Sequence, residues 1–384
     1  MIYSQMLLGH WVNLALHVDP AKKMIKNRLP GGEYLLQAFT VNEMVGIIEV
    51  AQHAGVSTAT VSRALNGKAN VSARARERVL LAAQELGYVA SSSAYTLATG
   101  KAKNIGVVMP FVDRWFFSTV LEGAVNALVN RGYDVTLYSL SGGKDNRSRI
   151  FEELVLRKRV DGVLTVGVKL SQSELTKLTE LEKPIIGVGG PIPGTRTIAI
   201  DDEGAGRLAT SHLISLGHTK IGMISGLPTT EMDFHQPYLR KTGYREALLD
   251  ANLSFDPQWD AQGDFTVGGG YYAAKQMLGN PQNAPTAIFC ASDEMGFGAI
   301  QAARDLGLRV PQDVSVIGID GHPLGEFYGL STVHQSVQKQ GAKAADALID
   351  ILESNDPRDQ ENFEEMTNWP IELVVRSSTA KRAP

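Results

Sequence analysis

Apolar residues recur at helical spacing in two short segments between residues 47 and 67. The first stripe is Val50, Ala51 and Ala54, and the second is Val56, Val61 and Leu65. Gly55 lies between the stripes, where a residue without a Cβ atom lets the chain reverse most easily. Ser57 is well placed to cap the second helix. The pattern therefore predicts two short helices joined by a tight turn, with a polar outer face on the second helix.

A third amphipathic helix is predicted directly after Val71. Ser72 is a suitable N-cap, and apolar residues recur at helical spacing until the helix ends at 87–88. Its first turns carry three arginines: Arg74, Arg76 and Arg78. A short polar segment, 91–100, and two lysines at 101 and 103 lead to the rest of the chain.

Beyond residue 104, strand-like and helical patterns alternate. The apolar runs are 105–109, 135–138, 162–166, 184–188, 221–224, 286–290 and 314–319, and helical patterns such as 120–129 and 204–216 lie between them. Continuous apolar runs are typical of strands buried on both faces of a parallel sheet. The alternation predicts α/β architecture. A stretch of ~280 residues is long for one doubly wound sheet, so we expect two sheets.

Charge is unevenly distributed along the 384 residues. The whole chain has a formal charge of −4, whereas residues 44–103 carry seven basic and three acidic side chains, which is +4 and leaves −8 for the remainder. A basic module attached to an acidic body is typical of a nucleic-acid binder with a separate regulatory domain.

The sequence has none of the common marks of an enzyme. It contains no Walker loop, no His-Glu-x-x-His pair, no nucleophile elbow and no Cys-x-x-Cys pair. The single cysteine, Cys290, excludes a disulfide within the monomer and suits a reducing cytoplasm. We therefore expect a cytoplasmic protein that is not an enzyme and has neither a metal site nor a cofactor.

One motif is highly specific. It reads Val50-Ala-x-x-Ala-Gly-Val-Ser-x-x-Thr-Val-Ser-Arg-Ala-Leu-Asn66, and it is followed by Val71-Ser72 and Glu85-Leu-Gly-Tyr88. It resembles the head piece of the lactose-repressor/galactose-repressor (LacI/GalR) family of bacterial transcriptional regulators, and the likeness extends from about residue 45 to the C-terminus. The resemblance implies a small all-α helix-turn-helix head piece and an α/β core like that of periplasmic binding proteins, in which a ligand cleft separates two Rossmann-like subdomains.

The resemblance also implies domain limits. We expect the helix-turn-helix domain at 44–90, a hinge helix and linker at 91–103, and an effector-binding and dimerisation core at 104–384. Within the core, the N-terminal subdomain is expected at about 104–201 and 334–363. The C-terminal subdomain is expected at about 202–333 and 364–384, so the chain should cross between them near 200–202, His334 and Glu364.

Residues 1–43 fit neither pattern. The stretch 6–18 is mildly apolar but contains Asn and two His, lacks a basic leader and an obvious cleavage site, and is too short and polar to span a membrane. Because members of the family usually begin just before the first helix, we predict that translation starts at Met44. The alternative is a poorly ordered N-terminal arm. An intact mass that matches all 384 residues would refute the later start.

For DNA, the resemblance assigns base contacts to Thr58, Ala59 and Arg63. Arg63 could donate two hydrogen bonds to guanine O6 and N7, whereas Ala59 could only touch a thymine methyl group or leave space. Six further residues are expected to contact phosphates, with helix capping as the alternative for each: Ser57, Thr60, Ser62, Asn66, Asn70 and Ser72.

The hinge departs from the family pattern at two positions. Leu97 matches a leucine that wedges into the minor groove, and Ala94 matches a small residue before it. Ala90, however, replaces a usual proline, and Tyr95 replaces a usual polar or basic residue. Two dyad-related head pieces reading a palindrome imply a homodimer. The sequence shows no leucine-heptad tail after the core, which favours a dimer over a tetramer.

For the effector, the resemblance points to seven residues of the core. Arg240 matches a ligand-binding arginine, Asp320 an acidic residue that accepts hydrogen bonds from hydroxyls, and Phe265 an aromatic that stacks on the ligand. The remaining four are Trp115 and Phe116 in the loop 113–117, with packing in the core or a dimer interface as their alternative, and Ser292 and Asp293, where the family usually has Asn-Asp.

These residue types suggest a neutral, polyhydroxylated effector. A sugar, polyol or cyclitol is the first choice and a nucleoside the second. The leading hypothesis is a dimeric repressor that binds double-stranded operator DNA, with no membrane partner, and whose affinity is controlled by this ligand. Activation, or a ligand acting as corepressor, would use the same parts. A solute-binding protein of a transporter would explain the core but not the head piece.

Overall fold

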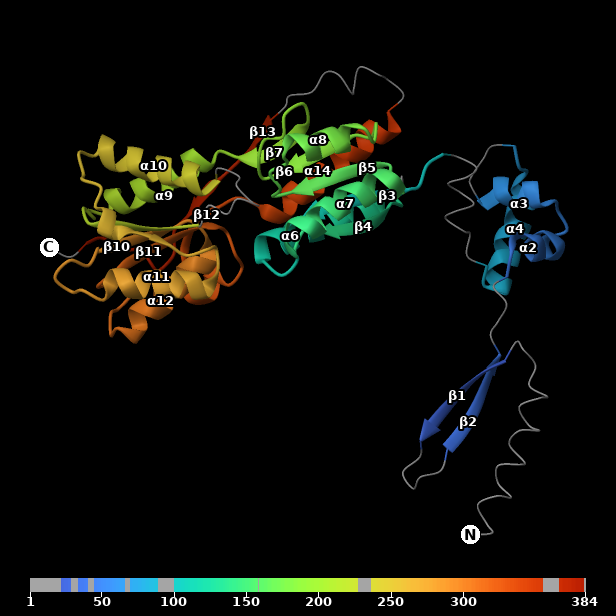
Figure 1. The fold of residues 1–384 in the computed structure, drawn as a ribbon, viewed down its shortest axis with the longest axis horizontal. Helices are drawn as coiled ribbons and strands as arrows, with labels where there is room; N and C mark the ends of the chain where they lie inside the picture. The colour runs from blue at the N-terminus through green and yellow to red at the C-terminus, as the bar shows by residue number, and fades with distance from the viewer. Residues whose placement is uncertain are drawn as a thin grey trace, which may run out of the picture. The chain divides into compact units, whose positions relative to one another are not determined.

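The computed structural model describes residues 22–28, 34–40, 45–65, 70–88, 100–157, 159–226, 236–354 and 366–382. These residues fall into two compact units, 1–100 and 101–384. Each unit is described by itself below (Figure 1).

The described residues of the first unit form a β-hairpin and three helices. Strands β1 (Lys22–Arg28) and β2 (Tyr34–Thr40) pair antiparallel. Helices α2 (Ile47–Ala54), α3 (Thr58–Leu65) and α4 (Ala73–Leu86) pack around a small apolar core. Val50, Val61 and Val79, one from each helix, are fully buried in it, so the predicted apolar stripes face one another. The prediction that translation starts at Met44 concerns a residue outside the described ranges.

The second unit contains two six-stranded sheets with helices packed against them (Figure 1). The N-terminal sheet has the strand order β13-β7-β6-β5-β3-β4 and every neighbouring pair is parallel. Its strands are β3 (Asn104–Met109), β4 (Asp134–Ser139), β5 (Gly162–Val166), β6 (Ile185–Val188), β7 (Arg196–Ile200) and β13 (Met366–Trp369). Its helices are α6 (Trp115–Asn130), α7 (Gly143–Arg157), α8 (Gln172–Thr179) and α14 (Val337–Glu353).

The C-terminal sheet has the order β14-β12-β11-β10-β8-β9, and the β12–β14 pair alone among its neighbours is antiparallel. Its strands are β8 (Ile221–Ser225), β9 (Asp260–Gln262), β10 (Ala287–Cys290), β11 (Ser315–Asp320), β12 (Ser331–His334) and β14 (Glu372–Val374). Its helices are α9 (Asp202–Ser215), α10 (Gln236–Asp250), η2 (Pro257–Trp259), α11 (Val267–Leu278), α12 (Asp293–Asp305) and α13 (Gly325–Tyr328).

Most predicted apolar runs form strands, and those in the middle of the sheets are buried throughout. β5, β8, β10 and β11 have no exposed residue. The run 135–138 differs, because it lies in the edge strand β4, where Leu137 remains 42% exposed. An edge strand has a neighbour on one side only, so an apolar pattern alone does not guarantee burial.

Along the described elements, the chain crosses between the two sheets three times. It leaves the N-terminal sheet after β7, returns between β12 and α14, and leaves again between β13 and β14. The last crossing was expected near Glu364, but it lies at Pro370–Ile371, because Met366–Trp369 pairs parallel with β7 in the N-terminal sheet. The predicted assignment of the whole of 364–384 to the C-terminal subdomain was therefore wrong for this strand.

Glycines allow close contact between α6 and α14. A Cβ atom on Gly123 would lie 1.9 Å from the carbonyl oxygen of Gln338, and one on Gly341 would lie 2.0 Å from that of Val120. Each helix thus presents a glycine to the backbone of the other. This contact fixes α14, which follows the second crossing, against α6, whose first residue is Trp115.

Within the described ranges, every helix is too short or too polar to cross a lipid bilayer.

Candidate functional site

Helix α3 presents a polar, solvent-exposed face, and its opposite face is packed into the core of the head piece. Helix α2 ends at Gly55, which has the left-handed conformation (φ 62°, ψ 43°) that the predicted chain reversal requires. On α3, Val61 and Ala64 are buried, whereas Thr58, Ala59 and Arg63 are exposed. The three residues predicted to contact bases therefore share the accessible side of one helix.

Both ends of α3 are held by hydrogen bonds. The Ser57 hydroxyl accepts from the Thr60 backbone N–H at 3.2 Å and lies 2.9 Å from the Thr60 hydroxyl. At the other end, the Arg76 guanidinium donates to the Ala64 carbonyl at 2.9 Å. Both contacts use backbone groups that a helix end leaves unpaired. Ser57 thus caps the helix as predicted, and Arg76 on α4 ties its C-terminus to the third helix.

The remaining predicted DNA contacts differ in how the structure presents them. Asn70 and Ser72 are exposed, and the Ser72 hydroxyl caps α4 by accepting from the Ala75 N–H at 3.3 Å. A capping hydroxyl still has its own proton to donate to a phosphate. Ser62 is half-buried on α3. Asn66 and the hinge residue Leu97 lie outside the described residues.

A buried charged cluster lies beside the carboxyl ends of the strands of the C-terminal sheet. Arg240 on α10 is only 4% exposed, and its Nε donates to Asp202 Oδ1 at 2.8 Å. Its Nη1 donates to the Ala291 carbonyl and lies 4.0 Å from Asp320 Oδ1. Burial acts to lower the pKa of Arg240, but the neighbouring carboxylates outweigh burial and raise it. Arg240 therefore stays charged and joins α9, α10 and the ends of β10 and β11.

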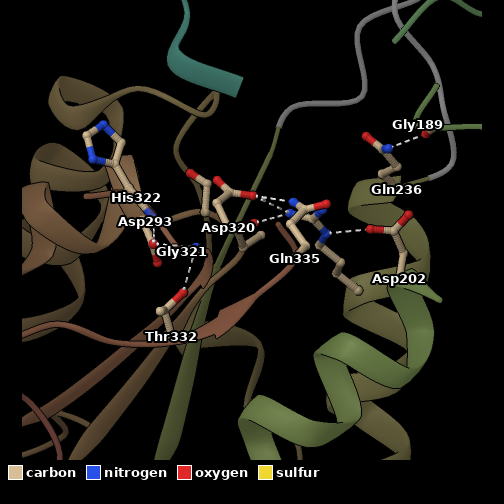
Figure 2. Close-up of polar contacts among 12 residues, drawn as sticks. Gly189, Asp202, Gln236, Asp293, Asp320, Gly321, His322, Thr332 and Gln335 are labelled. Atoms are coloured by element: carbon tan, nitrogen blue, oxygen red, sulfur yellow. Dashed lines mark hydrogen bonds and ion pairs between the residues drawn. The ribbon is translucent and has the colours of Figure 1, made fainter. Parts of the chain in front are cut away.

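Asp320 is the last residue of β11 and is almost completely buried. Its Oδ1 accepts a 2.7 Å hydrogen bond from the Gln335 side-chain amide, as Figure 2 shows. Burial raises the pKa of Asp320 to about 7, against the opposing effects of Arg240 and Gln335. Its backbone φ of 133° is rare for a residue with a side chain. The structure thus places the predicted hydroxyl acceptor next to the predicted arginine.

Asp293 and Ser292 have other local partners. The Ser292 hydroxyl caps α12 by accepting from the Met295 N–H at 3.3 Å. The fully buried Asp293 carboxylate accepts from the backbone N–H groups of Gly321 and His322 at 2.9 and 2.7 Å (Figure 2). The Asp293 bonds fix the loop that follows β11, and the Ser292 bond fixes the first turn of α12. Both residues can therefore position the backbone around the site.

The predicted aromatic residues come from both subdomains. Trp115 opens α6, and its ring centroid lies 4.5 Å from that of His322, which follows β11. Phe116 packs edge-on against Phe117. Phe265 has a left-handed φ of 59° and packs so closely against Gly226 that no Cβ atom would fit there. The Trp115–His322 contact brings together the edges of the two subdomains.

The sequence interpretation missed several residues of this cluster. Asp202 pairs with Arg240, Gln335 donates to Asp320, and His322 stacks on Trp115. Two further residues bridge the subdomains: Arg114 donates to the Asp264 carbonyl at 3.2 Å, and Gln236 donates to the Gly189 carbonyl. Asp202, His322 and Gln335 lie within two residues of the end of a strand, and the rule that ligands of α/β sheets lie at the carboxyl ends of strands could have found these three. Among the described residues, no three potential ligands are grouped as a metal site would need.

Two family models match the chain. The model of bacterial regulatory proteins of the lacI family matches residues 46–91, which contain the three-helix head piece. The model of the periplasmic binding protein-like domain matches residues 210–379, within the second unit.

Related proteins cover nearly the whole chain. The HTH-type transcriptional repressor PurR of Aliivibrio fischeri (strain ATCC 700601 / ES114) is 34% identical over 345 residues, which are 88% of this chain and 99% of that protein. The PurR repressor of Haemophilus influenzae (strain PittEE) is 33% identical over 339 residues, 87% of this chain and 98% of that protein.

Solved structures agree with this assignment. The Lac repressor dimer bound to operator and the anti-inducer ONPF matches with a TM-score of 0.76 at 26% identity and covers 88% of this chain and 100% of that chain. The complex of the transcriptional regulator CelR with cellobiose matches with a TM-score of 0.63 at 31% identity and covers 87% and 99%. The relatives are transcriptional regulators and not enzymes. The exposed α3 face, the two-sheet core and these matches show that the chain belongs to the LacI family of DNA-binding transcriptional repressors.

Proposed function

We propose that this chain is a dimeric repressor that binds a palindromic operator and changes its DNA affinity when a small ligand binds between its two subdomains. The observation that carries the proposal is α3, a short helix held at both ends whose exposed face combines Thr58, Ala59 and Arg63. A fixed helix with one arginine and short neighbours suits insertion into a major groove.

The proposed DNA contacts divide into two kinds. Thr58, Ala59 and Arg63 read bases, and Arg63 supplies most of the discrimination through a bidentate contact to guanine. The phosphate contacts come from Ser57, Thr60, Ser62, Asn66, Asn70 and Ser72, and Leu97 provides the minor-groove wedge. The assignments of Asn66 and Leu97 rest on the sequence resemblance alone.

An exposed aromatic patch on the C-terminal subdomain supports dimerisation. Phe327 is 85% exposed, and Leu324 and Tyr328 beside it are 45% and 38% exposed. Adjacent exposed apolar side chains are a feature of protein–protein interaction sites, and a second copy of this chain is the proposed partner. If so, Phe327→Glu should shift the mass measured by light scattering from dimer to monomer, whereas an unchanged dimer would exclude this patch.

The proposed effector contacts come from both subdomains. Asp320 accepts hydrogen bonds from ligand hydroxyls, Arg240 faces the same position, and Trp115, Phe116 and Phe265 cover the apolar faces of the ligand. Ser292 and Asp293 complete the set by holding the frame. Because these residues belong to elements that the crossings connect, a ligand that favours one arrangement of the subdomains would also favour one DNA affinity.

The chemistry of the effector follows from these groups. One carboxylate with an arginine beside it suits a neutral molecule with hydroxyl groups, so a sugar, polyol or cyclitol is proposed. The solved relative that contains cellobiose supports this class. A nucleoside is the second candidate, because the stacked Trp115–His322 pair offers an aromatic surface suited to a planar base.

Location and domain limits belong to the same proposal. A regulator of DNA with one buried, free cysteine, Cys290, fits the cytoplasm. We propose a head piece at 44–90, a hinge at 91–103 and a core from 104 onward.

The decisive experiment is affinity capture of genomic fragments on the purified protein, followed by sequencing, with Arg63→Ala as the matched control. The proposal expects enrichment of one inverted repeat by the wild type and weaker, less selective enrichment by the variant. Equal enrichment of all fragments at low salt would contradict operator binding. The protein bound to the enriched fragment is then titrated with panels of sugars, cyclitols and nucleosides, and a response to none of the three panels would contradict the proposed effector.

A further inference from the structure

Two glutamines join the proposed effector carboxylate to a helix of the other subdomain. Gln335 lies between the last residue of β12 and the first residue of α14, and Gln340 lies in the first turns of α14. Both side chains are buried, at 2% and 1% exposure. An uncharged amide is costly to bury unless its hydrogen bonds are satisfied, so the partners of these two side chains are informative.

The hydrogen bonds run in one direction. Gln340 Nε2 donates to the backbone carbonyl of Gln335 at 2.7 Å and to the Gln335 side-chain oxygen Oε1 at 3.1 Å. Gln335 Nε2 in turn donates to Asp320 Oδ1 at 2.7 Å. Because Gln340 presents a donor to Oε1, the Gln335 amide is held with its NH₂ group toward Asp320. A flipped amide would place an oxygen against the carboxylate and lose both bonds.

The hydrogen-bonded series Gln340–Gln335–Asp320, called the relay below, crosses the boundary between the subdomains. Asp320 ends β11 of the C-terminal sheet, whereas α14 packs against β5, β6 and β7 of the N-terminal sheet and contacts α6 through Gly123 and Gly341. Between the two glutamines, Ser336 has a left-handed φ of 48°, which is uncommon for a residue with a side chain. At the second crossing, the two subdomains are thus linked by side-chain hydrogen bonds as well as by the backbone.

We propose that Gln335 and Gln340 are positioning residues of the effector site, in which Gln340 orients the Gln335 amide so that its NH₂ group donates to the Asp320 carboxylate, favours the charged form of that carboxylate and ties it to α14. This inference rests on the proposed role of Asp320 in effector binding. A hydroxyl of a ligand donates to a charged carboxylate better than to a neutral carboxyl group. The relay therefore prepares Asp320 for the ligand and connects its state to the N-terminal subdomain.

Other charged groups act on Asp320 as well, and the test must separate them from the relay. They are Arg240 on α10 with its partner Asp202 on α9, and Asp293 and Glu294 at the start of α12. Burial and Glu294 raise the pKa of Asp320 and favour its neutral form, whereas Arg240, the Gln335 side chain and the backbone N–H of Asp293 favour the charged form. Replacing Gln335 leaves the other groups in place, so the change in the titration midpoint of Asp320 reports the contribution of the relay.

The experiment is a ¹³C NMR titration of the full-length protein labelled at aspartate Cγ, with the Asp320 signal assigned through Asp320→Asn. It needs no effector, so its failure is distinguishable from failure of the proposed function. Gln335→Met should raise the titration midpoint of Asp320 by about one pH unit, a tenfold change in the acid dissociation constant. Gln340→Met should raise it by a smaller amount, about 0.3 unit or twofold. Gln338→Leu, an exposed glutamine on the same helix, should leave it unchanged.

The double variant Gln335→Met/Gln340→Met decides whether the two residues act in series. The relay predicts the same midpoint as for Gln335→Met alone, because Gln340 acts only through Gln335. A midpoint in Gln340→Met that equals the wild-type value, or two shifts that add fully in the double variant, would overturn the proposal. If Gln340→Met fails to fold, Gln340→Leu removes the donor without adding a charge, and it should also raise the midpoint; a wild-type midpoint in that variant would overturn the proposal equally.

Discussion

Replacing Arg240 by methionine should strongly destabilise the core, because it removes the cation from a buried group of acids. Arg240, Asp202 and Asp320 are 4%, 5% and 6% exposed. The substitution deletes the 2.8 Å bond to Asp202, the bond to the Ala291 carbonyl and the attraction to Asp320 at 4.0 Å. Removing one partner of a buried ion pair typically costs about 3–5 kcal/mol, because the remaining charge is left without compensation.

Arg207 provides a matched control on the neighbouring helix α9. Its side chain is 41% exposed and pairs with Asp250 at 2.6 Å on the surface. Exposed pairs of this kind contribute about 0–1 kcal/mol. Arg207→Met should therefore reduce the free energy of unfolding several-fold less than Arg240→Met, although each change removes an arginine paired with an aspartate.

The loss should also depend on pH. Burial raises the pKa values of Asp202 and Asp320 even in the presence of Arg240, and without that cation they should rise further. An acid whose folded-state pKa lies above its unfolded value is favoured in the folded protein at low pH, and this advantage is lost as the pH rises. The deficit of Arg240→Met should accordingly shrink at pH 5 and grow between pH 6 and pH 8.

Urea unfolding of the full-length protein, followed by tryptophan fluorescence at pH 5, 7 and 8, measures both effects. Trp115, Trp259 and Trp369 lie in the second unit and report on the core. Adding Asp202→Asn to Arg240→Met should recover part of the loss at pH 7. A deficit for Arg240→Met no larger than that of Arg207→Met, or one that does not change with pH, would refute the reasoning from buried charge.

Three further predictions concern DNA, effector and packing. Arg63→Ala should weaken operator binding by about 1–3 kcal/mol and flatten preference at one base position per half-site; unchanged specificity in a competition binding assay would remove it from base readout. Asp320→Ala should leave operator binding intact in gel-shift titrations but abolish the response to the effector found in the panel; a normal response would mean that the ligand binds elsewhere. Gly123→Ala places a Cβ atom 1.9 Å from the Gln338 carbonyl oxygen and should lower the free energy of unfolding by about 1–3 kcal/mol. Gly268→Ala is the control, because its Cβ atom would meet no atom nearer than 4.0 Å. Equal melting temperatures for the two variants would show that α6 and α14 can separate freely.

The sequence alone determined the head piece almost completely. Its helices are amphipathic, its stripes converge in one core, and its ends are set by local chemistry at Gly55, Ser57 and Ser72. These signals act over three or four residues, and periodicity and capping rules can therefore detect them. The alternating strands and helices of the core were equally visible, because buried parallel strands are continuously apolar.

Tertiary structure decided where the last crossing lies and which polar groups meet. The strand Met366–Trp369 joins the N-terminal sheet only because β7, more than 160 residues earlier, offers it an edge. The partners of Arg240 lie 38, 51 and 80 residues away, and Asp293 Oδ2 accepts hydrogen bonds from backbone groups 28 and 29 residues away. No local pattern encodes such pairs. Burying a polar group costs desolvation free energy, and only a partner that the fold brings close can offset this cost. The sequence could therefore propose Arg240 and Asp320, whereas the roles of Asp202, Gln335 and Gln340 depend on the folded arrangement.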